Sequence, residues 1–86
     1  MKEINDNMKK VLLEINKKQG IHKRDLLLRT GLNFNELSKA IEELENKKLI
    51  SSNRHGGYIF YYLTDEGRKV LSEIIEESQR EESSMI

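Results

Sequence analysis

Residues 30–50 of this 86-residue chain read Thr-Gly-Leu-Asn-Phe-Asn-Glu-Leu-Ser-Lys-Ala-Ile-Glu-Glu-Leu-Glu-Asn-Lys-Lys-Leu-Ile, and they decide how the other segments are interpreted. Gly31 suits the left-handed position that ends one helix, and Asn33 can cap the next helix by accepting a backbone N–H. In that next helix three apolar residues recur at i, i+4 and i+7 and share one face: Leu37, Ile41 and Leu44. The pattern predicts a helix, a tight turn and a second helix, with one face in a core and the other free to contact a partner.

The composition indicates one small folded domain. Hydrophobic residues make up 36% of the chain and charged residues 35%, but the apolar residues cluster periodically, which argues against disorder. A chain of this length buries roughly 60–65% of the surface that its unfolded form exposes, so a partner subunit would add stability. The absence of cysteine excludes disulfides and thiolate zinc sites, and we expect neither a metal nor another cofactor.

Neither a membrane segment nor an export signal is visible. No apolar run approaches the roughly 18 residues that span a bilayer, and residues 1–7 are polar, unlike a signal peptide. We therefore expect a soluble protein of the cytoplasm with no membrane partner.

The net charge is zero, but the charges are unevenly distributed. Residues 1–57 carry twelve Lys or Arg against eight Asp or Glu, whereas residues 58–86 carry three against seven. The two parts therefore have balances of +4 and −4, which favours different partners for each. The simpler alternative is that charges scattered over solvated helix faces produce this asymmetry by chance.

Apolar periodicity and turn residues predict the other elements. A first helix should begin at Asn5 or Asp6, and Gly20 should end the helical stretch. Arg54, His55 and two glycines should form a hairpin loop between two short strands. The predicted ranges are a helix over about residues 5–18, a helix over 22–30, strands over 49–53 and 58–63, a helix over 64–80 and a disordered tail over 81–86.

The second predicted helix has two unusual features. His22, Lys23 and Arg24 lie at its N-terminus, where free N–H groups and positive charge favour an anion such as phosphate, although His22 alone is better explained as a cap. Its three consecutive leucines spread over about 200° of the helix, so Leu28 is either covered by the first helix or exposed to a partner.

The last predicted helix carries an apolar stripe about 140° wide, formed by Val70, Leu71, Ile74 and Ile75. This stripe is too wide for a helix that only touches a small sheet. Packing one edge on the domain and the other on a symmetry mate would bury it, which predicts a homodimer.

Three segments carry a resemblance to a known family: Thr30–Asn33 at the turn, Leu44–Ile50 where the third helix enters the first strand, and Tyr61–Arg68 where the second strand enters the last helix. They resemble small winged helix-turn-helix transcriptional regulators of the MarR, PadR and ArsR type, including compact archaeal and archaeal-virus regulators. The resemblance implies an α+β, mostly helical fold with three helices, a two-stranded wing hairpin and a C-terminal helix. For a viral member the location would be the host cytoplasm.

The resemblance also implies a homodimer that binds double-stranded DNA, with the third helix in the major groove and the wing on the backbone or minor groove. Helix periodicity selects an overlapping set of residues. Asn35 can pair with adenine, Lys39 can reach guanine or a phosphate, and Glu42 can accept from cytosine N4. The candidate DNA contacts are Lys23, Arg24, Asn33, Asn35, Ser38, Lys39, Glu42, Arg54 and His55, and the candidate dimer contacts are Val70, Leu71, Ile74 and Ile75.

The chain departs from the family's pattern at two places. Lys48 stands where many members have glycine before the first wing strand. Four glutamates outnumber three lysines along the presumed recognition helix and its end, which disfavours deep contact with phosphates. A protein-interaction module without specific DNA binding is therefore the alternative function.

Other classes of function have weaker support. Two histidines 33 residues apart, with no cysteine and no phosphate-binding glycine loop, provide no assembled catalytic group, so an enzyme is not expected. The aromatic residues of the second strand can be interpreted as a stacking platform for single strands, but an inward-facing hairpin explains them more simply. The sequence indicates no effector pocket.

Overall fold

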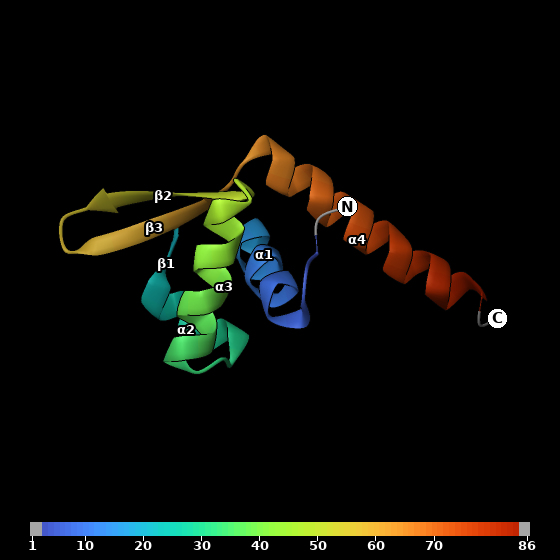
Figure 1. Ribbon diagram of the computed structural model, residues 1–86, viewed down its shortest axis with the longest axis horizontal. Coiled ribbons are helices and arrows are strands. Elements are labelled where there is room, and N and C mark those ends of the chain that lie inside the picture. Colours follow the sequence, from blue (N-terminus) through green and yellow to red (C-terminus); the bar gives the residue numbers. More distant parts are fainter. Residues whose placement is uncertain (1–2, 85–86) are drawn as a thin grey trace.

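The computed structural model describes residues 3–84, with side chains described through residue 77. Figure 1 shows four helices and a small sheet that extends away from them as a long hairpin. The elements in chain order are α1 (Asp6–Lys17), β1 (Ile21–His22), α2 (Lys23–Thr30), α3 (Phe34–Asn46), β2 (Ile50–His55), β3 (Tyr58–Leu63) and α4 (Asp65–Ser84). The predicted order of helices, hairpin and final helix is confirmed.

The first helix begins where its capping residue predicts. The Met8 N–H donates to Asn5 Oδ1 at 2.9 Å, which satisfies one of the backbone donors left free at a helix start. The buried residues of α1 lie at i, i+3, i+4 and i+7, one face of the helix, and belong to the core: Met8, Val11, Leu12 and Ile15.

The turn between α2 and α3 is specified locally. Gly31 adopts φ 71°, the left-handed conformation that ends α2. Asn33 Oδ1 accepts from the Glu36 N–H at 2.8 Å while Glu36 Oε1 accepts from the Asn33 N–H at 3.0 Å, which completes a capping box. Leu32 and Leu37 occupy the two positions of a hydrophobic staple, and both are buried in the core. Residues 30–37 therefore fix the start of α3.

The sheet has three strands rather than the two predicted. Its order is β1-β3-β2, and β1 pairs antiparallel with β3 through Ile21 opposite Tyr61 and His22 opposite Phe60. Two residues are too short to show a strand period, so β1 forms only because tertiary folding brings it to the free edge of β3. His22 lies just before α2, and its Nδ1 accepts from the Asp25 N–H at 3.2 Å, as expected for a cap.

The wing loop is shorter than predicted. Arg54 and His55 continue β2, opposite Ile59 and Tyr58, so the loop consists of two glycines. Gly56 adopts φ 65°, which a two-residue hairpin turn requires at its first position. The prediction that placed Arg54 and His55 in the loop was wrong, because cross-strand pairing extends to the last residue before the glycines.

The helix α4 is joined to the wing by a compact set of bonds. The Thr64 hydroxyl donates to the Lys48 carbonyl at 2.7 Å and accepts from the Gly67 N–H at 3.0 Å, so one side chain caps α4 and holds the end of α3. Lys48 itself takes φ 61°, which makes the turn that glycine would otherwise make.

The end of α4 differs from the predicted disordered tail. The helix continues through Ser84, because residues 79–84 contain neither glycine nor proline to stop it. Residues 85–86 lie outside the described part of the chain. Figure 1 shows that the C-terminal half of α4 extends away from the other elements.

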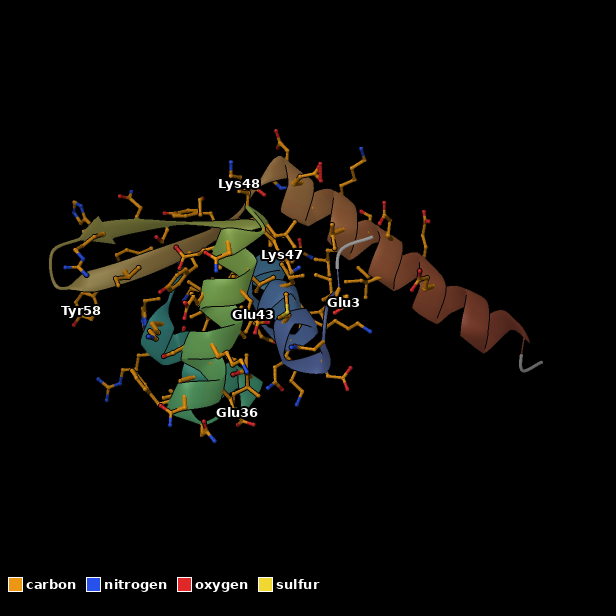
Figure 2. The ribbon with its side chains drawn as sticks, in the orientation of Figure 1. Glu3, Glu36, Glu43, Lys47, Lys48 and Tyr58 are labelled. Atoms are coloured by element: carbon orange, nitrogen blue, oxygen red, sulfur yellow. The ribbon has the colours of Figure 1, made fainter. Side chains whose placement is uncertain are left out.

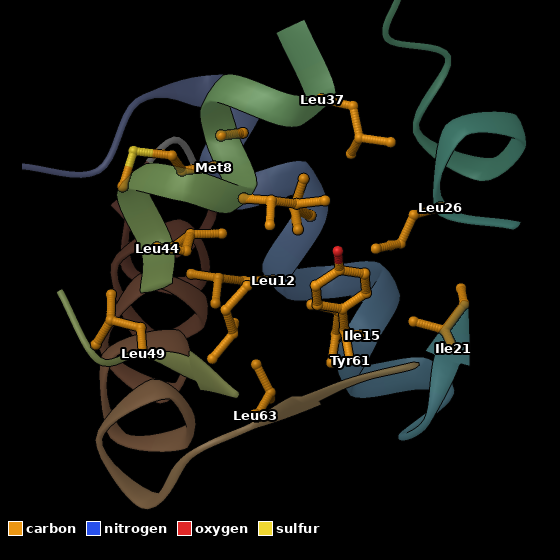
Figure 3. Packing of buried hydrophobic residues seen from close by; sticks show 14 of the residues in the cluster. Met8, Leu12, Ile15, Ile21, Leu26, Leu37, Leu44, Leu49, Tyr61 and Leu63 are labelled. Carbon is orange, nitrogen blue, oxygen red and sulfur yellow. The ribbon is translucent and has the colours of Figure 1, made fainter. Parts of the chain in front are cut away.

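One apolar core occupies the space between the helices and the sheet. Figure 3 shows side chains from the three N-terminal helices and from β3 that point into this shared interior. Within residues 3–84, no helix has the length and apolarity needed to cross a membrane. Because the core lies on one side of α3, the opposite side of that helix is left uncovered.

Candidate nucleic-acid interface

The uncovered side of α3 is polar. Leu37, Ile41 and Leu44 are buried in the core, and the residues on the opposite side are exposed. These exposed residues present amide, ammonium and carboxylate groups along one line of the helix: Asn35, Lys39, Glu42 and Asn46. Such a row has the donors and acceptors that a major groove can pair with.

Three of the four glutamates of α3 lie outside the outward row. Glu36 completes the capping box, and Glu45 accepts a hydrogen bond from the Ser52 hydroxyl of β2 at 3.3 Å. Glu43 is half-buried and lines a cavity with Glu3 and Lys47, on the side of α3 that faces the N-terminal segment (Figure 2). Glu42 is thus the one glutamate of α3 in the outward row, so the helix face is less acidic than the sequence suggests.

The polar side-chain atoms of two candidate DNA contacts do not point freely into solvent. The Ser38 hydroxyl is buried and has no hydrogen-bond partner within the described residues, so it does not reach the surface in this rotamer. The Asn33 side-chain oxygen accepts a hydrogen bond from the Glu36 N–H, so it is occupied by the helix cap. Both residues were candidates implied by the family resemblance, which could not reveal the packing around Ser38.

The N-terminus of α2 contributes two of the candidate cations. Arg24 is exposed and forms no ion pair within the described residues. Lys23 is half-buried, and its Nζ lies 4.5 Å from the centroid of the Phe34 ring, at the start of α3. This contact brings the beginnings of α2 and α3 together, so the Lys23 ammonium lies at the start of α3.

Asp25, the next residue of α2, is neutralised locally. Lys18 lies 3.3 Å from its carboxylate and Arg29 lies 3.8 Å from it. The hydrogen bond from Lys18 lowers the pKa of Asp25 below its usual value, and the charge of Arg29 acts in the same direction. This acidic side chain therefore adds little net negative field near Lys23 and Arg24.

The wing carries exposed polar and aromatic groups. Arg54 and His55 are both exposed near the end of β2, and Arg54 has no ion-pair partner among residues 3–84. Opposite them, the exposed Tyr58 ring lies 5.9 Å from the His22 ring, and the Phe60 ring lies 6.3 Å from both. These rings connect the base of α2 to the wing.

The apolar stripe of α4 is divided between two environments. Leu71 is 3% exposed and belongs to the core of its own domain. Val70 and Ile74 are half-buried and line a groove of about 360 Å³ together with Ile4, whereas Ile75 is 39% exposed. Three of the four candidate dimer contacts therefore retain surface that a partner can cover.

The structure adds one residue that the sequence did not select. Phe34, the first residue of α3, is 60% exposed. The sequence signal that could have identified it is a phenylalanine at a helix start, outside the apolar stripe of that helix. Within residues 3–84, no group of three His, Cys, Asp or Glu residues is arranged to hold a metal ion.

The fold and the exposed polar helix define a winged helix-turn-helix protein. The family model described as wHTH-PRTase associated matches residues 11–86, and the chain belongs to this family. No curated protein matches the sequence.

Several solved structures share this fold. The PcaV transcriptional regulator from Streptomyces coelicolor, in complex with its natural ligand, has 22% identity and a TM-score of 0.89, covering 98% of this chain and 62% of its own. RV1404 from Mycobacterium tuberculosis has 19% identity and a TM-score of 0.87, covering 96% and 58%. A MarR family transcription regulator has 15% identity and a TM-score of 0.89, covering 95% and 56%.

These matches confirm the predicted fold class, α+β and mostly helical with a wing. The chain spans about three fifths of the length of these structures.

Proposed function

We propose that this protein is a sequence-specific regulator of transcription that binds double-stranded DNA in the cytoplasm as a homodimer. In this proposal α3 of each subunit enters the major groove and the wing rests on the backbone or in the minor groove. The observation that carries the proposal is the outward row of α3, which is exposed and polar. The helix that carries this row is fixed at its start by the capping box of Asn33 and Glu36.

Each part of the interface has a distinct task. Asn35 pairs with adenine, Lys39 reaches guanine or a phosphate, and Glu42 accepts from cytosine N4 and rejects sites that lack this donor. Lys23, Arg24, Arg54 and His55 contact phosphates and fix the register without reading sequence. Asn33 acts through the capping box, which holds the start of α3 in place.

The homodimer follows from the remaining apolar surface. Val70, Ile74 and Ile75 lie on the helix that extends from the domain, where a second copy can cover them. A two-fold symmetric protein reads two half-sites, which adds the affinity of two helices to one binding event.

Binding is tested by fluorescence anisotropy with the full chain. The probes are a duplex from the region upstream of its own coding sequence and a scrambled duplex of equal composition, each measured at several salt concentrations. We expect a preference of roughly a thousandfold for the first duplex and a steep salt dependence. Weak and equal binding to both duplexes would contradict recognition of this site.

Two charge deletions test the proposed face. Replacing Lys39 or Arg54 with alanine should weaken binding and lower the slope of log K against log salt by about 1 for each substitution, because each removes one phosphate contact. Lys69→Ala is the matched control, since Lys69 is an exposed cation on α4 and outside this face. An unchanged slope in both test variants would rule out these two residues as phosphate contacts.

The family description gives a specific reason for a second candidate function. A wHTH-PRTase associated chain can serve as an interaction module for a PRTase, with exposed apolar residues such as Leu28, which is 74% exposed on α2, at the contact. Co-purification at fixed stoichiometry with a PRTase from the same organism, abolished by Leu28→Ser, would support this role. Intact binding by the Leu28→Ser variant would remove Leu28 from the contact.

A further inference from the structure

Phe34 is a large apolar residue that the domain leaves in solvent. Its side chain is 60% exposed, whereas the residues of α3 that face the core have exposures between 0% and 4%. Exposing an aromatic ring forfeits the hydrophobic gain of burying it, so the ring is available to a partner that covers it.

The fold does not require Phe34 at this position. The capping box is made by Asn33 and Glu36, and the staple positions on either side are held by Leu32 and Leu37. Phe34 is the first helical residue and takes part in neither device. Its role is therefore separate from starting the helix.

Lys23 holds the ring from one side. Its Nζ lies 4.5 Å from the ring centroid, a cation–π distance, so the ammonium covers one face of Phe34. With 60% of the residue exposed, part of the Phe34 side chain remains open to a partner. An ammonium has three N–H donors, so Lys23 can also bond a phosphate.

The position of the ring suggests what it contacts. In helix-turn-helix docking, the N-terminal residues of the recognition helix meet the base edges, and Phe34 begins that helix. The one apolar group that bases present in the major groove is the 5-methyl group of thymine, which phenylalanine can contact. A ring with a cation on one face is suited to lie between that methyl group and the phosphate backbone.

We propose that Phe34 reads the 5-methyl group of a thymine in each half-site, with Lys23 positioning its ring and binding the adjacent phosphate. This inference rests on the proposed DNA-binding function and adds a specificity residue to it. Because the methyl group is absent from uracil, the contact can be removed from the DNA without changing base pairing.

The test combines one protein change with one DNA change. The preferred duplex is selected from random duplexes with the 86-residue chain, and each thymine is then replaced by uracil, one at a time. We expect the wild-type protein to lose about fourfold in affinity at one thymine of each half-site, the effect of one buried methyl group. Phe34→Ala should bind the thymine and uracil duplexes equally, while Phe34→Leu should still prefer thymine.

Tyr58→Ala is the matched control, because Tyr58 is also aromatic and 60% exposed but lies on the wing. It should keep the preference for thymine. If selection yields a preferred duplex but uracil has no effect in the wild type, or Phe34→Ala keeps the full loss, the inference is overturned and the proposed function stands. If no duplex is preferred over random sequence, both are overturned.

Discussion

At the scale of single residues, the junction where α3, β2 and α4 meet contains two unusual backbone positions. Lys48 adopts a left-handed conformation that suits glycine, and Gly67 lies so close to the Leu49 carbonyl that a side chain does not fit. The Thr64 hydroxyl bonds both the Lys48 carbonyl and the Gly67 N–H, so these positions form one structural unit. Their energetics can be measured separately.

Lys48→Gly should stabilise the protein. With φ 61°, Lys48 carries the steric cost of a left-handed residue, on the order of 1 kcal/mol, which glycine does not have. After allowance for the greater freedom of glycine in the unfolded chain, we expect a gain of about 0.5 kcal/mol. Urea denaturation measures it. Lys48→Ala keeps the Cβ strain and should give no gain, so equal stabilisation by both variants would argue against a backbone origin.

Gly67→Ala should destabilise the protein although it lies within a helix. Helix propensity alone predicts a gain of about 1 kcal/mol. The new Cβ would overlap the Leu49 carbonyl oxygen, which also accepts from the Thr64 N–H at 3.0 Å. We expect a net loss of about 1–3 kcal/mol by thermal unfolding. Gly57→Ala, which meets no atom within 4 Å, is the control and should change stability far less.

At the scale of elements, charge links α1 to α2. Lys18 follows the end of α1 and donates to the Asp25 carboxylate of α2 at 3.3 Å, and Arg29 approaches the same carboxylate one turn later. The same carboxylate also lies in the first turn of α2, where the helix dipole favours negative charge. Protonating Asp25 would weaken all three interactions.

Asp25→Asn should make the free energy of unfolding depend less on pH in the acid range. Because the folded-state pKa of Asp25 is lowered, its contribution is present above the unfolded-state pKa and is lost as pH falls through the folded-state pKa. The wild type should therefore lose stability below about pH 4 more steeply than the variant. Urea midpoints across this range measure the difference. Asp65→Asn removes a fully exposed partner of Arg68 and should alter the profile less.

For the molecule as a whole, the small core leaves apolar side chains of α4 partly exposed. The core includes Leu71 but leaves Ile75, four residues later on α4, 39% exposed. A helix that extends into solvent with an apolar residue of this size gains stability by pairing with a second copy. Dimerisation and reading of two half-sites would then depend on the same helix.

Ile75→Glu should convert the proposed dimer to a monomer, because it places a charge in an apolar contact. Sedimentation equilibrium would give the mass directly, and DNA affinity should fall by at least tenfold through loss of the second half-site. Lys69→Glu introduces a negative charge on the opposite side of α4 and should leave the mass unchanged. A wild-type chain that sediments as a monomer would contradict the dimer itself.

Much of the interface could be predicted because it depends on local patterns. Helix periodicity placed Asn35, Lys39 and Glu42 on the outer face of α3, and all three are exposed. Their DNA contacts remain proposals. The same periodicity could not show that the Ser38 hydroxyl is buried, nor that Glu36 and Glu45 are bonded elsewhere, because these depend on neighbours brought together by folding.

The order of helices and hairpin, the caps of the early helices and the polarity of the faces of α3 were predictable from the sequence, since they follow from contacts within a few residues. Three features depend on tertiary packing: Ile21 and His22 join the sheet, Arg54 and His55 extend a strand, and Leu71 is buried while Ile75 is not. Those outcomes depend on contacts between residues distant in the chain, which local sequence periodicity does not predict.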